Sequence, residues 1–312
     1  MIESKVYCII VTFNAMKWVD KCFSSLRNSH IPIIPVVIDN GSKDETVNYI
    51  KTNYPEAHII LNEQNKGFGQ ANNQGIEWAY HKGATHFFLL NQDAWIEPDA
   101  ISNLIEIQDK NNIDVAAPIH LNGVGDSVDF GYYEYLQFEF PMQSLFASAL
   151  KHELHEYYPI EFVNAAGWVI SRDTVETIGG FDPIFFHYGE DRNYTQRLKY
   201  HKKSFAIIPS SIMYHDRVQH GNEQVYNKKR VISTLLKEYA DVNKHEAWYS
   251  HNRIKLQLWL FRDVIKYIIK FNVRTTVDLL NGFKEFYSKK GQILESLKHN
   301  KEVKSNWLNI LE

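Results

Sequence analysis

The sequence is short of cysteine and contains no long uncharged apolar run. Cys8 and Cys22 are the only cysteines among 312 residues, and both lie in segments that we predict to be core elements. This favours a reduced cytosolic protein over a disulfide framework. No stretch of 18 uncharged apolar residues occurs, and the N-terminus leads directly into a strand-like segment, so we expect neither a transmembrane helix nor a signal peptide. We therefore expect a cytoplasmic protein.

Two phosphate-binding motifs are also missing. No G-x-G-x-x-G follows the first predicted strand, which weakens an interpretation as a dinucleotide-dependent dehydrogenase, and no G-x-x-x-x-G-K-[ST] occurs. The segment 67–72 resembles the first motif only superficially, because it follows the third predicted strand and lacks the third glycine. A bound phosphate would then be held by a metal ion rather than by a glycine-rich loop.

Charge is distributed unevenly although the net charge is only −3. Residues 1–216 carry 16 Lys and Arg against 27 Asp and Glu, a balance of −11, whereas residues 217–312 carry 18 against 10, a balance of +8. The split predicts two units, a domain over 1–216 and an extension over 217–312 that faces different surroundings, such as an anionic surface. We do not expect nucleic acid among the partners.

Alternating apolar runs and helical patterns fill the first ninety residues. The residues from 5 to 13 read as a strand buried on both faces, because the apolar run is continuous. Further strands are predicted at 33–38, 58–61 and 86–90, and helices at 17–28, 44–53 and 70–82. This βαβαβαβ order predicts an α/β protein with a mostly parallel sheet flanked by helices. The carboxyl ends of its strands should form one ligand-binding edge at 12–14, 39–42, 65–69 and 91–93.

The remaining sequence is less regular. We predict helices at 99–111, 173–179 and 190–202, strands at 115–118, 162–171 and 204–208, and loops with a hairpin over 120–160. From 226 onward the pattern is helical, with breaks near Asn272 and Gly291.

Two strand-end carboxylates are candidate ligand contacts. Asp93 follows the apolar run 87–90, where it could anchor a metal–diphosphate, because Mg²⁺ binds carboxylates together with phosphate oxygens. Alternatively it is an ordinary loop aspartate. Asp39 ends the second strand and could accept hydrogen bonds from a base or a ribose. The alternative for Asp39 is a helix-capping turn, since Asp-Asn-Gly-Ser is strong turn chemistry.

Glu190 and Asp191 are two adjacent carboxylates at a predicted helix start, after an aromatic stretch. The positive end of the helix favours the ionised form and aromatic neighbours oppose it, which suits a general base. The alternative is the ordinary acidity of a first helical turn. His215 follows the last predicted strand, and taken alone it is more typical of a core or surface histidine than of a ligand.

Taken in order, these segments resemble the family 2 glycosyltransferases of GT-A fold. The motifs that carry the resemblance are V-T-F-N (11–14), I-D-N-G-S (38–42), N-K-G-F-G-Q-A-N-N-Q-G (65–75), N-Q-D (91–93), G-G-F-D-P-I-F-F-H-Y-G-E-D (179–191) and His215. Within the family the sequence is most similar to the rhamnosyltransferase-like branch, which builds bacterial cell-surface polysaccharides. The resemblance covers roughly residues 5–216 and implies a nucleotide-diphosphate sugar as donor, Mg²⁺ or Mn²⁺, and inversion at the anomeric carbon.

The resemblance also implies roles for individual residues. Those expected to line the donor site are Thr12, Asn14, Asp39, Asn40, Ser42, Asn65, Gly67, Phe68, Asn72, Asn73, Asn91, Gln92 and Asp93. Asp93 and His215 would hold the metal, Asp191 would be the base with Glu190 beside it, and Gly167 and Trp168 would lie on the acceptor side. The sequence departs from the family's D-x-D element at Asn91, which removes one anion from the metal site. We therefore expect the donor's phosphates to complete the metal shell.

Alternatives to a glycosyltransferase remain open from the residues. A sugar nucleotidyltransferase would need a glycine- and arginine-rich loop after the first strand, and residues 13–17 do not form one. A non-catalytic sugar-nucleotide-binding protein of the same fold would have no need of both Asp93 and Asp191.

The extension has one further pattern, a basic amphipathic helix predicted at 251–271. It could contact an anionic membrane on the inner face of the cell, which would suit a polyprenyl-diphosphate-linked saccharide acceptor, or pack on the catalytic domain or a second subunit of a homodimer.

Overall fold

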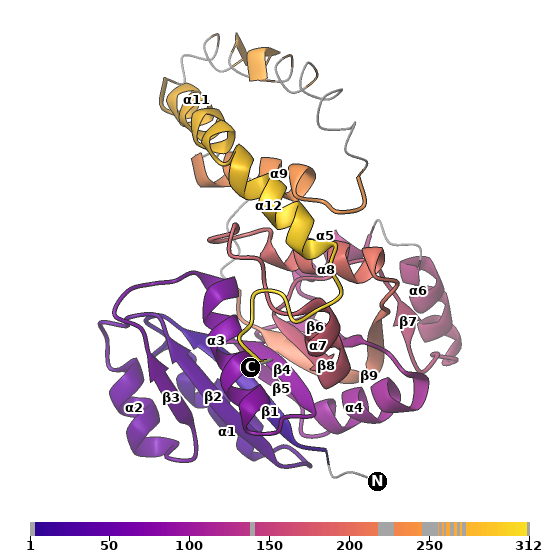
Figure 1. The fold of residues 1–312 in the computed structure, drawn as a ribbon. Helices are drawn as coiled ribbons and strands as arrows, with labels where there is room; N and C mark the ends of the chain where they lie inside the picture. Colours follow the sequence, from indigo (N-terminus) through magenta and orange to yellow (C-terminus); the bar gives the residue numbers. More distant parts are fainter. Residues whose placement is uncertain are drawn as a thin grey trace.

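A mixed β-sheet forms the centre of the molecule (Figure 1). This computed structural model describes residues 4–137, 141–217, 228–244 and 273–310, with isolated residues between 255 and 269. The strands are β1 (Val6–Thr12), β2 (Ile33–Asp39), β3 (His58–Leu61), β4 (His86–Asn91), β5 (Ala94–Ile96), β6 (Val115–Asn122), β7 (Tyr158–Pro159), β8 (Gly167–Ser171) and β9 (Phe205–His215). Their order is β3-β2-β1-β4-β8-β6-β9-β5, and β7 pairs with β9.

Strands β1 to β4 are parallel, as the sequence predicts. The register aligns Thr12 of β1 with Asp39 of β2, and Val11 of β1 with Asn91 of β4. The carboxyl ends of these strands therefore lie side by side at one edge, where open α/β sheets bind ligands.

The second half of the sheet differs in part from the sequence prediction. Strand β8 is antiparallel to β4 and β6, and β9 is parallel to β6, so β9 runs in the same direction as β4. The last predicted strand was too short, because β9 continues to His215 and pairs there with Ala94 of β5, a strand that the sequence pattern did not indicate. His215 consequently reaches the ligand-binding edge.

Helices cover both faces of the sheet, as Figure 1 shows. Their bounds are α1 (Val19–Arg27), α2 (Thr46–Asn53), α3 (Phe68–His81), α4 (Ala100–Asn111), α5 (Phe130–Leu136), α6 (Pro141–Lys151), α7 (Arg172–Ile178), α8 (Glu190–Tyr200), α9 (Lys228–Tyr239), α11 (Val273–Ser288) and α12 (Lys290–Asn300). Side chains of α3, α7 and α8 pack on one face, and those of α1, α2 and α4 pack on the other. The expected helix-covered α/β sheet is confirmed.

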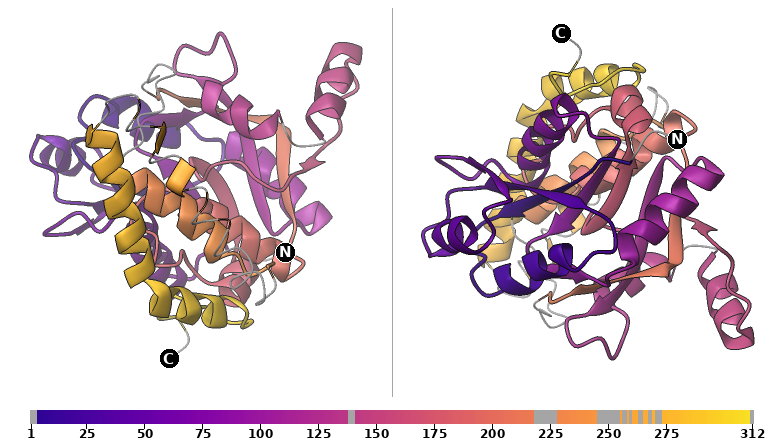
Figure 2. Two further views of the ribbon diagram at one scale, coloured as in Figure 1. Left: turned by 90° about the horizontal axis from the view of Figure 1, so that it is seen from above. Right: turned by 90° about the horizontal axis from the view of Figure 1, so that it is seen from below.

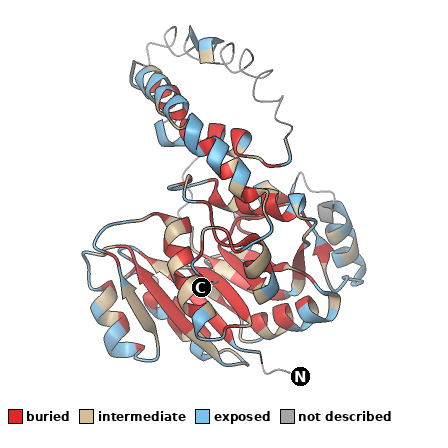
Figure 3. Ribbon diagram, in the orientation of Figure 1, coloured by how far each residue is buried: buried red, intermediate tan, exposed pale blue. Residues whose placement is uncertain are grey.

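Strand β1 illustrates why the core forms. Tyr7 and Ile9 point into one core cluster, whereas Val6, Cys8 and Ile10 point into the other, so alternate residues fill both faces of the sheet. Figure 3 shows these central strands as buried throughout. Full burial of such a side chain stabilises the fold by ~1.5–3 kcal/mol. Both cysteines are buried and free, as expected of a protein without a disulfide framework.

The expectation of loops with a hairpin over 120–160 is confirmed in part: Leu121 and Val128 form an antiparallel bridge, but the segment also contains the helices α5 and α6. Helix α5 begins where the Asp129 side chain accepts a hydrogen bond from the backbone N–H of Tyr132. Tyr132 and Leu136 are then buried one helical turn apart. The sequence pattern missed this helix because only seven residues contribute and exposed aromatic residues such as Phe130 and Tyr133 obscure its buried face.

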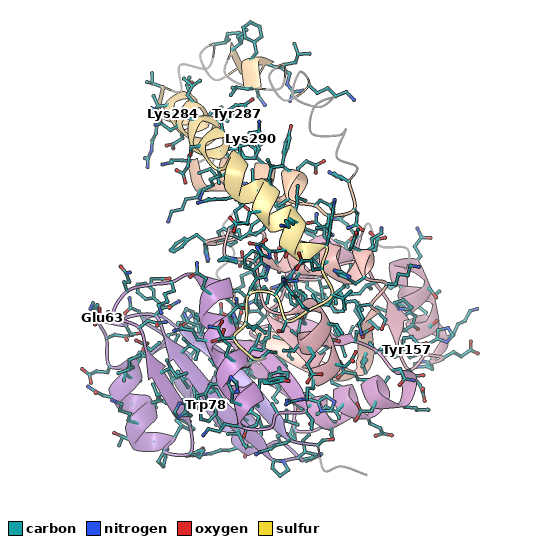
Figure 4. The ribbon with its side chains drawn as sticks, viewed as in Figure 1. Glu63, Trp78, Tyr157, Lys284, Tyr287 and Lys290 are labelled. Atoms are coloured by element: carbon teal, nitrogen blue, oxygen red, sulfur yellow. The ribbon has the colours of Figure 1, made fainter. Side chains whose placement is uncertain are left out.

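The C-terminal helices α9, α11 and α12 lie above the sheet domain in Figure 1, where α12 continues from the end of α11 and α9 packs against α11. Figure 2 shows the same helices from above and from below. They share a separate core that contains Val231, Leu235, Leu279, Phe283 and Ile293. Figure 4 shows side chains of α11 and α12, Lys284, Tyr287 and Lys290 among them, on the outside of this unit, where all three are exposed. The predicted break near Gly291 falls between Ser288 and Lys290.

The segment after α12 returns to the sheet domain. Leu308 and Ile310 join the core beneath α3, and Asn306 accepts a hydrogen bond from the Gly180 N–H through its carbonyl. Ser296 and Asn300 of α12 both donate to the buried carboxylate of Asp182. The extension is thus bound to the sheet domain at several points, and the boundary at residue 216 stays a prediction.

The predicted basic helix at 251–271 lies outside the described residues apart from isolated positions, so its contact with a membrane or a second subunit stays a prediction. Within the described part of the chain, no helix is both long and apolar enough to cross a membrane.

Candidate active site

A cavity of about 390 Å³ opens at the carboxyl edge of the sheet. It is lined by residues of the strand ends, of the loop before α3, of the loop before α8 and of α9: Val11, Phe13, Asn40, Asn65, Gly67, Phe68, Asn91, Gln92, Asp93, Phe186, His187 and Lys229. Of these residues, the three asparagines, Gly67, Phe68, Gln92 and Asp93 were predicted from the sequence to line a donor site. It did not assign Phe13, Phe186, His187 or Lys229.

Asp39 organises one wall of this region from a buried position. Its Oδ1 accepts hydrogen bonds from the hydroxyls of Thr12 and Ser42, and its Oδ2 accepts from the backbone N–H groups of Gly41 and Ser42. These four donors fill the acceptor capacity of the carboxylate. This geometry supports the turn-capping alternative, while contact with a base stays a prediction. Asn14, at a φ of 51°, joins the same turn by accepting from the Lys43 N–H.

Asn40 connects the second strand end to the loop before α3. Its side chain donates to the Gly67 carbonyl and accepts from the side chain of Asn62. The side chain of Asn65 accepts from the Gly67 N–H over 2.7 Å. Hydrogen bonds therefore connect Asn40, Asn65 and Gly67, three residues of the cavity wall that were predicted to contact the donor.

Gly67 permits a close approach between this loop and the segment before α8. Its φ is +82°, and a Cβ built on it would lie 2.0 Å from the carbonyl oxygen of Phe186. Only glycine combines that backbone conformation with that contact.

We expect Gly67→Ala to destabilise the protein by about 2–4 kcal/mol and to weaken donor binding, because both the left-handed strain and the clash with Phe186 must be relieved. Gly83→Ala is the matched control, since Gly83 has the same φ of +82° and no atom within 4 Å of its added Cβ. Thermal unfolding should rank Gly67→Ala well below Gly83→Ala. Equal melting temperatures for the two variants would contradict the role of the close approach.

Asn72 and Asn73 lie in the first turns of α3, and both are buried. Asn73 binds the backbone of Phe181 twice, donating to its carbonyl over 2.8 Å and accepting from its N–H over 2.7 Å. The Asn72 side chain donates to the Phe68 carbonyl over 3.0 Å. These contacts hold the loop before α8 against α3, and direct donor contacts by the two asparagines stay a prediction.

Asp93 and His215 come together although 122 positions separate them in the chain. His215 Nε2 lies 3.3 Å from Asp93 Oδ1, with the imidazole 2 % exposed and the carboxylate 23 % exposed. Asn91 Nδ2 lies 3.4 Å from the same imidazole nitrogen. Gln92 instead accepts a hydrogen bond from the Phe13 N–H and so fixes the loop after β1. A carboxylate that faces the cavity is thus paired with a buried imidazole.

This donor set fits a divalent cation that is completed by phosphate oxygens. Among the described residues, no cluster of three or more His, Cys, Asp or Glu side chains could hold a metal ion alone. Mg²⁺ commonly takes one or two carboxylates and substrate phosphates. Asp93 and His215 agree with that pattern, and neutral Asn91 adds no charge.

Asp191 and Glu190 begin α8, directly after Gly189 at a φ of 106°. Burial raises the pKa of Asp191, while the backbone N–H of Arg192, which donates to its Oδ1 over 2.7 Å, opposes that rise. Burial, and then the charge of Asp191, raises the pKa of Glu190 to about 8. Glu190 is 5 % exposed and its Oε2 has no hydrogen-bond partner. A pKa of about 8 keeps Glu190 mostly protonated at neutral pH.

The raised pKa of Glu190 makes stability depend on pH. Because its pKa is higher in the folded chain than its ordinary 4.5, its contribution is complete below about pH 4.5 and is lost as pH rises through about 8. We expect Glu190→Gln to melt several degrees above the wild type at pH 9 and close to it at pH 5. Glu106→Gln, which removes an exposed carboxylate of α4, should keep the wild-type profile. Equal melting of wild type and Glu190→Gln at pH 9 would contradict this charge state.

Tyr135 and Arg217 connect the two carboxylate sites. Burial and then the charge of Asp191 raise the pKa of Tyr135, which also contacts Arg217. Arg217 Nη2 in turn lies 3.4 Å from His215 Nδ1. Neither residue belongs to a predicted motif; the position of Arg217, two residues after His215, was the one available signal.

Gly167 and Trp168 begin β8 in the interior of the sheet domain. Both are buried, and the Trp168 ring packs against Phe181, Tyr194 and Phe205 in the core. A Cβ on Gly167 would lie 2.3 Å from the sulfur of Met213. Because this motif forms β8, a central strand whose side chains are covered on both faces, the acceptor-side role of the two residues stays a prediction.

The fold is GT-A-like, a mixed sheet flanked by helices with a cavity at its carboxyl edge. The sequence profile of glycosyl transferase family 2 matches residues 7–178, more than half of the chain. The chain belongs to this family, whose members are nucleotide-sugar-dependent glycosyltransferases. Membership removes the sugar nucleotidyltransferase alternative.

Similar proteins agree with this assignment. The dTDP-rhamnosyl transferase RfbF of Shigella flexneri is 23 % identical over 219 residues, which are 68 % of this chain and 69 % of that protein. The structure of S. aureus TarS 1-349 with UDP-GlcNAc superposes with a TM-score of 0.57 at 12 % identity, covering 95 % of this chain and 90 % of that one. GalNAc-T7 with UDP, GalNAc and Mn²⁺ gives a TM-score of 0.57 at 16 % identity, covering 75 % and 48 %. These structural similarities show the fold.

Proposed function

We propose that the chain is an inverting, metal-dependent glycosyltransferase that moves a hexose, with rhamnose favoured, from a nucleoside-diphosphate donor to a saccharide acceptor. The main support is the cavity at the carboxyl edge of the sheet. Asp93 lies in its wall, and His215 Nε2 is 3.3 Å from Asp93 Oδ1. The rhamnose donor is supported by the name of RfbF, and Mn²⁺ by the ion named in the GalNAc-T7 structure.

The donor would lie along the strand ends. The apolar walls formed by Phe13 and Phe68 suit the base and sugar faces, and the amides of Asn40 and Asn65 frame the polar side. Asp93 and His215 would hold the cation, which when bound supplies positive charge against the diphosphate. Because Asn91 is neutral, Asp93 is the single carboxylate of the N-Q-D motif. The cation would therefore bind most tightly when the phosphates of the donor are also present.

Asp191 is the group that we assign as base. In a single displacement, the acceptor oxygen forms a bond to the anomeric carbon while the bond from that carbon to the phosphate oxygen breaks. The acceptor proton passes to the Asp191 carboxylate, and the bonding electrons leave with the nucleoside diphosphate. Attack from the opposite face inverts the anomeric carbon. Glu190, held neutral by its pKa of about 8, leaves Asp191 as the proton acceptor of the pair at neutral pH.

A thermal-shift screen of dTDP-, UDP- and GDP-sugars with Mn²⁺ tests the donor assignment. The true donor should raise the melting temperature most, since stabilisation grows with the ratio of ligand concentration to Kd. Sugar transfer or donor hydrolysis with the selected compound then separates an enzyme from a sugar-nucleotide-binding protein. Binding without any turnover across saccharide and polyprenyl-diphosphate-linked acceptors would favour the binding protein.

A further inference from the structure

The C-terminal extension places one cation in the donor cavity. Lys229, in the first turn of α9, lines the same cavity as Asp93 and Asn40. It lies outside residues 7–178, the part of the chain that matches the family profile. We propose that Lys229 binds the diphosphate of the donor and positions it beside the Asp93 site. This assignment rests on the proposed nucleoside-diphosphate donor.

The charges that line the cavity support this role. Among the described lining residues, Asp93 is the single carboxylate and Lys229 is the single lysine or arginine. Asn91, beside Asp93, is neutral. Burial and then the charge of Lys229 lower the pKa of His187, so that this imidazole is uncharged at neutral pH. A diphosphate bound to one divalent cation keeps a net negative charge. Lys229 is the permanent side-chain cation placed to neutralise it.

Lys229 is available for a ligand, unlike its neighbour. Lys228 forms an ion pair with Glu285, with 2.6 Å between Nζ and Oε2. Lys229 is exposed, and across the described ranges of the chain no carboxylate forms an ion pair with it. The charge of Lys229 acts unfavourably on a protonated His187, whose pKa it lowers. An anion in the cavity would therefore gain a cation that no described carboxylate already neutralises.

The position of Lys229 is fixed relative to the donor cavity. The Ser233 hydroxyl of α9 donates to the Tyr188 carbonyl over 2.6 Å, and Ile232 packs with Phe185 in one core cluster. The same loop carries Phe186, whose carbonyl meets Gly67 across the cavity wall. Helix α9 thus holds Lys229 against the two loops between which the donor would bind.

Isothermal titration of the full chain with UDP, dTDP and GDP, each with Mn²⁺, tests the proposal. For the nucleotide that binds the wild type, Lys229→Gln should raise the Kd about 10-fold or more, and Lys229→Arg should restore most of the affinity. The corresponding nucleoside monophosphate should lose less affinity than the diphosphate. The slope of log Kd against log salt concentration should also fall in Lys229→Gln, which a purely structural effect would not produce.

Lys228→Gln is the matched control, since it removes an adjacent charge from the same helix turn and should leave nucleotide affinity within about twofold of the wild type. Unchanged diphosphate affinity in Lys229→Gln, or equal losses of affinity for the mono- and diphosphate, would overturn the role of Lys229 and leave the donor assignment standing. A wild-type chain that binds none of the three diphosphates would instead overturn the donor assignment, and this role with it.

Discussion

Asp191→Asn is expected to lower kcat by ~10²–10⁴-fold while leaving nucleotide affinity close to that of the wild type, because general-base assistance is lost and the donor cavity is unchanged. An asparagine oxygen at this position can still accept the hydrogen bond from the Arg192 N–H, so the start of α8 should be preserved. Initial rates at saturating donor and acceptor, together with titration of the nucleoside diphosphate, measure the two effects separately.

The pH dependence adds an independent readout. Burial raises the pKa of Asp191, so the wild-type rate should rise with pH, with a midpoint above the ordinary aspartate value of 3.8, as the carboxylate becomes ionised. Asp173→Asn is the control, because Asp173 lies in the first turn of α7 with its side chain 71 % exposed. If Asp191→Asn kept a turnover within about threefold of the wild type, another group would have to serve as base.

Loss of metal-dependent donor binding is the expected result of Asp93→Asn. The substitution preserves size and removes the one carboxylate that lines the cavity among the described residues, so Mn²⁺-dependent affinity for the nucleoside diphosphate should fall by ~10²-fold or more, with a similar loss of transfer. His215→Ala should act in the same direction, since its Nε2 lies 3.3 Å from Asp93 Oδ1.

Titrations with Mn²⁺ and with a chelator measure this effect, and Asp99→Asn is the control. Asp99 precedes α4 at an exposed position, and its replacement should leave the metal dependence intact. Nucleotide binding by the wild type that is indifferent to the chelator would contradict the metal assignment.

The sequence predicted the parallel half of the sheet and the edge at which the site forms. Those predictions succeeded because β1, β2 and β4 are continuous apolar runs, and because parallel strands necessarily bring their carboxyl ends together. Local residue chemistry identified Asp93 and Asp191 as candidates, a carboxylate at a strand end and one at a helix start, and their roles stay predictions.

Other features depend on tertiary contacts that no local pattern encodes. The pairing of Ala94 with His215 creates β5 and extends β9. The burial of Trp168 follows from covering β8 on both faces, which a motif position cannot reveal. Lys229 enters the cavity only because α9 packs on the loop before α8, and its sequence neighbours carry no signal of that contact.

The return of the chain beneath α3 means that the C-terminal extension is not an interchangeable module. Ser296 and Asn300 donate the hydrogen bonds to Asp182 Oδ2, and Leu308 and Ile310 complete a core that otherwise belongs to the sheet domain. A chimera that joined this sheet domain to another protein's extension would have to retain these contacts as well as Lys229. Specificity in such chains would consequently diverge by substitution within both halves together, rather than by exchange of one half.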